Sequence, residues 1–547
     1  LIMRPPREKP LAIFKPFNVV MDGSRAVYIF LVRKLVRQGI VTLLLLGAVV
    51  AGICLISKRV NSSFLPEEDK GTIFAHIELT PGATISRTME VVQKVQERLR
   101  QAPNVKNVMA VGGFSFITGE AENAAIFFID LADWSKRTAF ESQIGQLKGR
   151  FQALLGDFPE ISSMVFTPPA IMGLGITGGV TFVLCNEGNA TQIELAEEAR
   201  RIANELSARP DVQHAMTTFT ADTPQLRGDL DRDKAEALGL TAGMIFSALQ
   251  SQFGSYYVND FNFGGETFYV KMQSDRRFRV TLDDIRDLQI RNKHGEMVPL
   301  SSVCSLRFVI GPRRLERFNK ELSAEIDVQA MRGVSSSQIM DAIEKLQLKP
   351  GYHVEWRDMS YQERENQGQI VTLVALAMLF AYLFLVAQYE SWTIPVPVML
   401  TVMTALLGAF AGLWLMKEDL SIYAQLGLVM LIGLTAKNAI LMVEFSKQER
   451  EAGKDVYTSA VNGASLRYRA VLMTAWSFLF GVFPLVIATG AGAGSRRAIG
   501  ISTFSGMLLA TIAGIIMTPA LYAVFQRIRE AVKRFFGMQA AIPDGDD

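Results

Sequence analysis

Cysteine, histidine and charged residues are all scarce in this chain of 547 residues. It has 3 Cys and 4 His, and charged residues make up 20% of the total, against about 25% in an ordinary soluble domain. Cys54, Cys185 and Cys304 lie too far apart for a disulfide scaffold, and we interpret each as a small buried hydrophobic residue. The histidines show no ligand spacing such as HxxxH, so we expect no metal site and no cofactor.

Motifs of hydrolytic enzymes are absent as well. The sequence has no GxxxxGK[ST] phosphate loop, no GxSxG elbow and no HExxH pair, so we expect the protein not to be an enzyme. The net charge is only +2, which gives no reason to expect a nucleic acid as partner. If the protein is a pump, its energy must come from an ion gradient or another subunit.

What the sequence does contain is a set of long hydrophobic runs. About 20 apolar residues are needed to cross a bilayer, and six runs qualify: Gly39–Ser57, Gln369–Ala387, Ile394–Met416, Ser421–Phe445, Ala470–Thr489 and Ile499–Val524. A buried core helix explains any one of them but not the closely spaced last five. We therefore predict an integral membrane protein, with the lipid bilayer as one of its partners.

The chain starts Leu-Ile-Met, so we expect a longer reading frame before it.

Lysine and arginine on the short flanks set the orientation. Residues 1–38 are basic and mix apolar with polar positions, which predicts a cytoplasmic amphipathic segment; a simple leader into the span at 39–57 explains them equally well. The predicted five-helix membrane segment 369–524 and cytoplasmic tail 525–547 complete the membrane part. Residues 58–368 then lie outside the cytoplasm.

That large block alternates between strand and helix periodicity. The order β-α-β-β-α-β over residues 73–169 predicts a ferredoxin-like subdomain within 58–178. The pattern begins again at 179, breaks off, and resumes near 313. We predict a second repeat made of 179–223 and 313–358, with an inserted subdomain at 224–312. The predicted fold class is thus an α-helical membrane protein with six spans, joined to an α+β region of two ferredoxin-like subdomains.

One lysine lies in the middle of a predicted span. Lys437 costs about 2.5–3.5 kcal/mol at a bilayer centre, so it should be paired or line a wet path; snorkelling is a poor alternative, because both ends of the span are distant. Glu444 is two helical turns away, and no other predicted span holds Asp or Glu. We predict that the acid partner lies outside this chain. Asn438 and Thr474 can supply hydrogen bonds, while Arg467 is either a lipid-facing anchor or part of a proton path.

Several long segments resemble a known family. GLTAKNAILMVEFSKQ (433–448), RYRAVLMTAWSFLFGVFPLVIATGAGAGSRRAIG (467–500), MSYQERENQ (359–367), GSYYVNDFNFGG (254–265), DTPQLRGDLDRDKAEALGL (222–240) and AQYESWTIP (387–395) resemble multidrug efflux pumps of the resistance–nodulation–division superfamily. The branch is the hydrophobe/amphiphile exporters of Gram-negative inner membranes. The likeness covers nearly the whole chain.

The resemblance implies a mechanism and partners. Members have two such halves and twelve spans, and this chain resembles the C-terminal half. It implies that Lys437 is the charge partner of proton-carrying aspartates in an absent N-terminal half, with Arg467, Thr474 and Asn438 in the relay. It also implies proton-driven export of hydrophobic and amphiphilic compounds by a homotrimer joined to a periplasmic adaptor and an outer-membrane channel. Residues 224–312 would be the docking subdomain and the two repeats porter subdomains.

Substrate contacts follow from the same resemblance. GGFSFITGEAEN (112–123) resembles the family's switch loop, and Phe114, Phe116, Phe128 and Phe166 match pocket aromatics. Spacing alone favours packing roles for these rings; the resemblance favours substrate binding for Phe114, Phe116 and Phe166. The segment is acidic, with Glu120 and Glu122, which weakly favours basic or zwitterionic compounds.

Three other functions remain open at this point. A metal-ion exporter of the same superfamily is disfavoured, since the extracytoplasmic methionines form no clear thioether triad. A membrane receptor or scaffold without transport would not need Lys437. An inactive half-length fragment is the third alternative.

Overall fold

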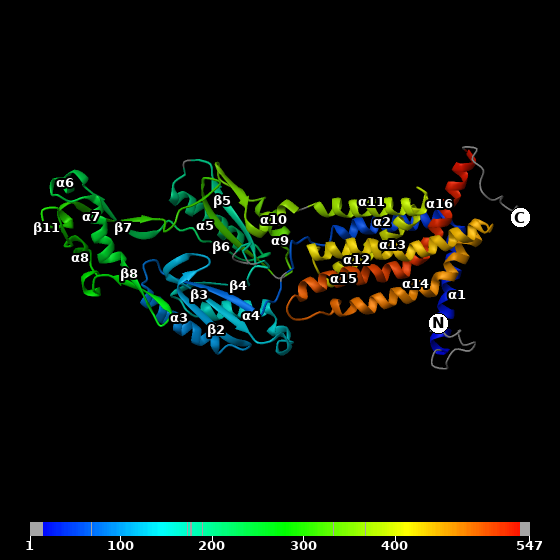
Figure 1. The fold of residues 1–547 in the computed structure, drawn as a ribbon, viewed down its shortest axis with the longest axis horizontal. Coiled ribbons are helices and arrows are strands. Elements are labelled where there is room, and N and C mark those ends of the chain that lie inside the picture. The colour runs from blue at the N-terminus through cyan, green and yellow to red at the C-terminus, as the bar shows by residue number, and fades with distance from the viewer. Residues whose placement is uncertain are drawn as a thin grey trace. The chain divides into compact units, whose positions relative to one another are not determined.

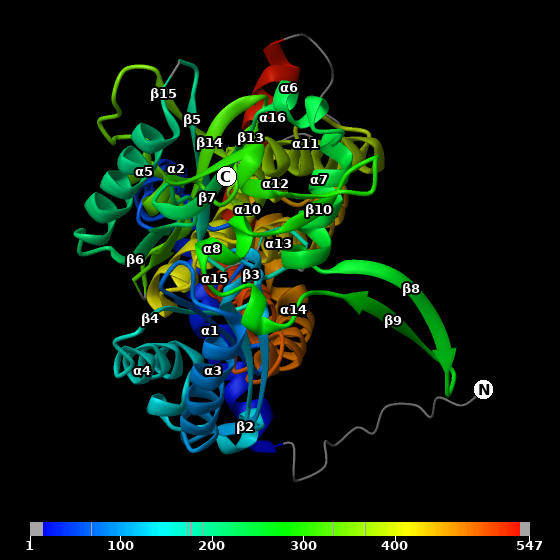
Figure 2. The same cartoon turned by 90° about the vertical axis from the view of Figure 1, so that its left-hand side faces the viewer.

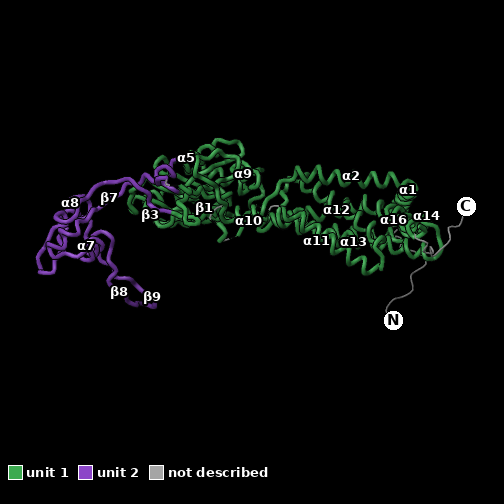
Figure 3. Tube along the Cα trace, turned by 90° about the horizontal axis from the view of Figure 1, so that it is seen from above, with its two compact units in different colours: residues 1–189, 198–218, 316–547 green, residues 190–197, 219–315 purple. Residues whose placement is uncertain are grey.

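The computed structural model describes residues 15–66, 68–171, 173–175, 178–188, 190–331, 333–366 and 368–535 (Figure 1). It forms two compact units, coloured separately in Figure 3. Unit 1 contains residues 1–189, 198–218 and 316–547, and unit 2 contains 190–197 and 219–315. The first 14 residues and the last 12, parts of the predicted cytoplasmic segments, lie outside the described residues.

Long apolar helices of unit 1 confirm the six predicted spans. They are α2 Gly39–Ser57, α11 Gln369–Tyr389, α12 Pro395–Met416, α13 Ile422–Glu451, α14 Val456–Val486, and α15 Ala493–Leu509, which continues through a π-turn (Ala510–Gly514) into α16 Ile515–Phe535. Helices α13 and α14 are longer than their spans and leave a connection of only a few residues. Asp455 caps α14 by accepting a hydrogen bond from the backbone N–H of Thr458.

Helix α1 (Lys15–Arg37) packs against the membrane helices through one apolar face. Tyr28, Val32 and Val36 are buried there, and the Tyr28 ring stacks on Tyr468 of α14 at a centroid distance of 4.5 Å. Arg25 also donates a hydrogen bond to Ser465. These contacts fix α1 against α14 through one of its faces.

The first sheet of unit 1 has the strand order β2-β3-β1-β4, with antiparallel pairs throughout. Its elements follow in the order β1 Thr72–Leu79, α3 Ile85–Arg100, β2 Val105–Ser115, β3 Gly119–Leu131, α4 Ile144–Gly156 and β4 Ile161–Phe166. Ile73, Ala75 and Ile77 of β1 pack with apolar residues of α3 and α4. Because side chains alternate along a strand, the neighbouring residues of β1 face the other way.

The second sheet repeats this order. Its path is β13-β14-β5-β15, with β6 also paired to β14. The elements are β5 Val180–Asn186, α5 Gln192–Ser207, β6 Val212–Thr217, β13 Glu316–Phe318, β14 Glu321–Ala330, α9 Ser336–Ile343 and β15 Tyr352–Trp356, followed by α10 Asp358–Asn366. Ser335 and Gln338 form a capping box at the start of α9.

Unit 2 interrupts the second repeat and has its own small core around Leu240, Ile245 and Leu300. The predicted insertion at 224–312 lies inside it. Its elements are β7 Thr223–Leu230, α6 Arg232–Ala237, α7 Ala242–Leu249, β8 Tyr256–Phe263, β9 Glu266–Met272, α8 Leu282–Arg286, β10 Gln289–Arg291, β11 Met297–Pro299 and β12 Cys304–Gly311. Strands β7 and β12 pair with each other, and β8 and β9 form a hairpin (Figure 2).

Candidate functional site

A row of large side chains crosses the first sheet on the face opposite α3 and α4. The strand register places Phe128 of β3 between Met109 of β2 and Phe74 of β1, and Phe74 in turn is opposite Phe166 of β4. Directly opposed residues of an antiparallel pair have side chains in contact range. Four strands that are separate in sequence therefore build one continuous apolar row.

The phenylalanine rings of this row contact one another edge to face. Phe74 lies 5.1 Å from Phe128 and 5.8 Å from Phe166 between ring centroids. Phe116 is 5.9 Å from Phe128 and 5.7 Å from Phe114. We define Phe74, Phe114, Phe116, Phe128 and Phe166 as the phenylalanine cluster; edge-to-face pairs of this kind stabilise by about 0.5–1.5 kcal/mol beyond their buried area.

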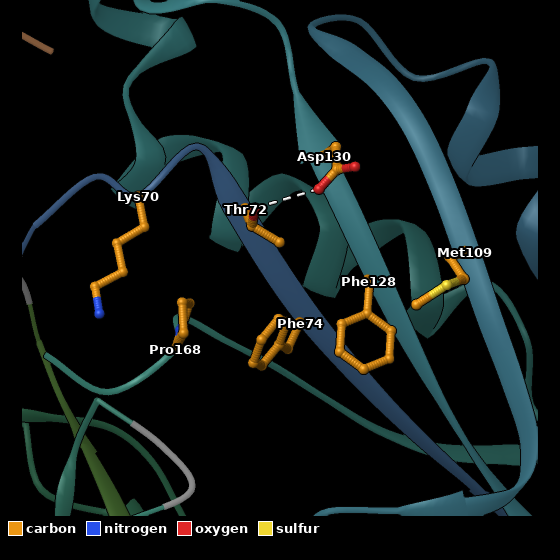
Figure 4. Close-up of a pocket in the computed structure, with 7 residues that line it drawn as sticks. All are labelled: Lys70, Thr72, Phe74, Met109, Phe128, Asp130 and Pro168. Atoms are coloured by element: carbon orange, nitrogen blue, oxygen red, sulfur yellow. Dashed lines mark hydrogen bonds between the residues drawn. The ribbon is translucent and has the colours of Figure 1, made fainter. Parts of the chain in front are cut away.

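A cavity of about 390 Å³ opens beside the cluster (Figure 4). This volume is within the range of small-molecule pockets. Phe74, Phe128 and Met109 form its apolar wall, and Pro168 lies across from them. Its polar lining residues are Lys70, Thr72 and Asp130; the Thr72 hydroxyl donates to Asp130 Oδ1 at 3.2 Å, and Lys70 Nζ donates to two backbone carbonyl oxygens at 2.8 Å.

The segment 112–123 is not a free loop. It forms the end of a hairpin in which β2 runs to Ser115 and β3 begins at Gly119, with only a short turn between them. Glu120 and Glu122 are exposed while Ala121 and Asn123 are buried, so this acidic segment has the period of two that a strand requires. Phe114 lies in β2 next to a bulge, and Phe116 lies in the turn.

The predicted aromatic residues thus gather at one place but differ in access. Phe116 is exposed, Phe114 and Phe128 are half-buried, and Phe166 is fully buried with its ring against Phe74. Only Phe128 of the four lines the cavity. The sequence interpretation missed Phe74 and Met109. Alternation along residues 73–80 could have predicted the face of the sheet on which Phe74 lies. Only the order of the strands shows that Phe74 lies at the centre of the row.

The predicted charged site lies in the membrane helices. Lys437 is midway along the 30-residue helix α13 and is exposed. In the half of α13 that precedes Lys437, the exposed residues are Leu426, Met430 and Gly433. Together with Lys437 they form one stripe at helical spacing. Within the described part of the chain, Lys437 makes no hydrogen bond and no ion pair.

The three residues predicted to accompany Lys437 are on α13 and α14. Asn438 is half-buried next to it, and Thr474 of α14 is exposed, its hydroxyl donating to the Val471 carbonyl oxygen at 2.9 Å. The Arg467 guanidinium lies 3.6 Å from the centre of the Phe445 ring, a cation–π contact that joins the two helices. Its Nε atom is buried and has no hydrogen-bond partner among the described residues.

These features define a multi-pass helical membrane protein with a large α+β region outside its spans. The chain belongs to the AcrB/AcrD/AcrF family, whose family model matches residues 1–526. It is a resistance–nodulation–division protein of the Gram-negative inner membrane, as the sequence motifs predicted.

Relatives support the same assignment. The chain is 36% identical over 517 residues to the multidrug export protein AcrF of Escherichia coli K12, covering 93% of this chain and 50% of that protein. It is 34% identical to the multidrug resistance protein MdtF of the same strain, covering 96% and 51%. It is also 34% identical to the toluene efflux pump membrane transporter TtgB of Pseudomonas putida, covering 95% and 49%. The chain spans about half the length of the curated relatives it matches.

Proposed function

We propose that this chain supplies the C-terminal half of a pump that exports hydrophobic and amphiphilic compounds and is driven by the proton gradient. Relatives named as multidrug or toluene efflux proteins support the substrate class. The phenylalanine cluster and the adjoining cavity support it independently, because aromatic walls with a few polar groups suit bulky amphiphilic ligands.

The exposure of Lys437 is the observation that carries the energy-coupling proposal. An ammonium group halfway through a membrane helix is costly in lipid unless an acid or water meets it. Lys437 lies on a stripe of α13 that the described chain leaves uncovered. We infer that carboxylates from the complementary half cover this stripe. Protonation of these carboxylates would weaken their attraction to Lys437 and so link proton binding to helix movement. Asn438, Arg467 and Thr474 would lie around the lysine and the carboxylates.

The proposed assembly is a homotrimer that docks to a periplasmic adaptor and an outer-membrane channel. Within it, residues 58–178 form one porter subdomain and residues 179–223 with 313–358 another, both ferredoxin-like. Residues 224–312 form the docking subdomain. Every residue of the β8–β9 hairpin is exposed, including Phe261 and Phe268, which supports contact with a second copy.

The test is a Lys437→Ala substitution in a pump assembled from this chain and its complementary half. Drug or dye efflux from cells should fall to background, because the acids lose their counter-charge, while the amount of membrane-inserted protein stays unchanged. Lys447→Ala is the matched control: it removes a lysine from the same helix, where Lys447 lies over the Tyr389 ring, and should retain efflux.

Efflux at the wild-type level in Lys437→Ala would overturn the assigned role of the lysine. Proton antiport by this chain alone in liposomes would contradict the inferred need for external acids. Failure of the unsubstituted pump to export any hydrophobic compound would favour a receptor, a scaffold or an inactive fragment.

A further inference from the structure

Three potential metal ligands meet at one end of the second sheet. Cys185 is the second-last residue of β5. Strand β5 lies between β14 and β15 (Figure 2). The register places His353 of β15 directly opposite Cys185, and Ser323 of β14 opposite it on the other side. Glu321 is two residues from Ser323 and therefore shares its face of the sheet.

The ligand atoms of this Cys185–Glu321–His353 cluster are already close together. The thiol sulfur, a carboxylate oxygen and an imidazole nitrogen lie within 4.8 Å of one another. Ligands of a tetrahedral Zn²⁺ lie about 2.0–2.3 Å from the metal and hence roughly 3.5 Å apart. The separations in the cluster, at most 4.8 Å, are therefore at most about 1.3 Å wider than this spacing.

One of these groups, the Cys185 thiol, is buried without a hydrogen bond in the described chain, and a second, the His353 imidazole, is only loosely held. Cys185 is 1% exposed, and among the described residues its sulfur makes no hydrogen bond. The Nδ1 atom of His353 is itself shielded from solvent and makes no well-formed hydrogen bond among the described residues; its nearest acceptor is a carboxylate oxygen of Glu187 at 3.4 Å. A buried polar atom without a partner calls for an explanation, and a bound ion is one.

Carboxylates surround the imidazole and make the cluster attractive to a cation. The nearest oxygens of Glu187, Glu321 and Glu355 lie 3.4, 3.5 and 3.7 Å from His353 nitrogens. Burial raises the pKa of Cys185 to about 12, with further contributions from Glu321 and Glu355. A bound metal ion would instead lower the pKa of the thiol, because a coordinating thiol gives up its proton.

We propose that Cys185, His353 and Glu321 bind one divalent cation of the Zn²⁺ class. Sulfur, imidazole and carboxylate together suit Zn²⁺ or Co²⁺ and do not suit the hard cations Mg²⁺ and Ca²⁺. Glu355 or water takes the fourth position. The ion ties β5, β14 and β15 together at the end of the sheet, independently of any role of the chain in export.

Titration of the purified full chain in detergent with Co²⁺ tests the proposal. A cobalt–thiolate charge-transfer band should appear at one equivalent and be displaced by Zn²⁺. Cys185→Ala should abolish the band, and His353→Gln and Glu321→Gln should each weaken Zn²⁺ binding by about tenfold or more. Thermal unfolding without metal checks that each variant is folded.

Substitutions at the other cysteines and at a distant histidine are the matched controls. Cys54→Ala, Cys304→Ala and His294→Gln should leave the band and the Zn²⁺ affinity unchanged. The proposal is overturned if the wild type shows no thiolate band, if the band survives Cys185→Ala, or if Zn²⁺ binds folded Cys185→Ala and His353→Gln as tightly as the wild type.

Discussion

At the scale of single residues, Glu363 shows how burial changes a side chain's chemistry. This residue of α10 is 7% exposed. Burial raises the pKa of its carboxyl from 4.5 to about 7; hydrogen bonds from Ser336 and the Phe64 backbone oppose the shift, and the charge of Asp419 adds to it. The acid is therefore largely protonated below neutral pH in the folded protein, whereas the same acid in an unfolded chain would be ionised.

This shift makes a pH-dependent contribution to stability. An acid whose pKa is raised on folding stabilises the protein fully below the unfolded value of 4.5, and that contribution disappears as the pH rises toward 7. We expect the free energy of unfolding of the wild type to fall by about 3 kcal/mol over this window. The melting temperature should fall with it. Glu363→Gln should flatten the profile, and Glu365→Gln, at an exposed position of the same helix, should not. A Glu363→Gln profile as steep as that of the wild type would contradict the assignment.

At the scale of helices and strands, local patterns were predictable and long-range pairings were not. Runs of apolar residues predicted the six membrane helices, because length and hydropathy alone decide whether a helix can span a bilayer. The sequence also placed most strands of the two sheets. It did not reveal Phe74 as the centre of the phenylalanine cluster, nor the approach of Cys185 to His353. Both depend on which strands pair and in what register, and side-chain periodicity within one strand carries no such information.

Close packing of the membrane helices gives a test at the same scale. A Cβ atom at Gly463 of α14 would lie 2.6 Å from the backbone nitrogen of Ser446 and 2.8 Å from its Cα atom on α13. Gly463→Ala should therefore separate the helices and cost about 1–3 kcal/mol. Gly481→Ala on the same helix meets nothing within 4 Å and should be neutral or slightly stabilising, since alanine favours helix. Thermal unfolding in detergent compares the two; equal melting temperatures would contradict the packing argument.

At the scale of the whole molecule, two exposed surfaces of the described residues call for a protein partner. One is the stripe on α13 that contains Lys437. The other is the β8–β9 hairpin of unit 2, where Phe261 stacks on Phe268 and both residues are about half exposed. A two-stranded hairpin is marginally stable by itself in water, and large exposed apolar patches mark interaction sites. The two surfaces call for different partners: acids within the membrane for the stripe, and an apolar protein surface for the hairpin.

The hairpin provides the test of the proposed homotrimer. Replacing Phe261 and Phe268 together by serine removes the stacked aromatic pair of the hairpin without altering any buried core residue, so each protomer should stay folded. In a complete pump, the double variant should run as monomers in size-exclusion chromatography where the wild type runs as trimers, and efflux should fall in parallel. Phe278→Ser, at another exposed phenylalanine of unit 2, should leave the trimer intact. A double variant that remains trimeric would exclude the Phe261–Phe268 pair as the main contact between copies, because other residues would then supply the energy of association.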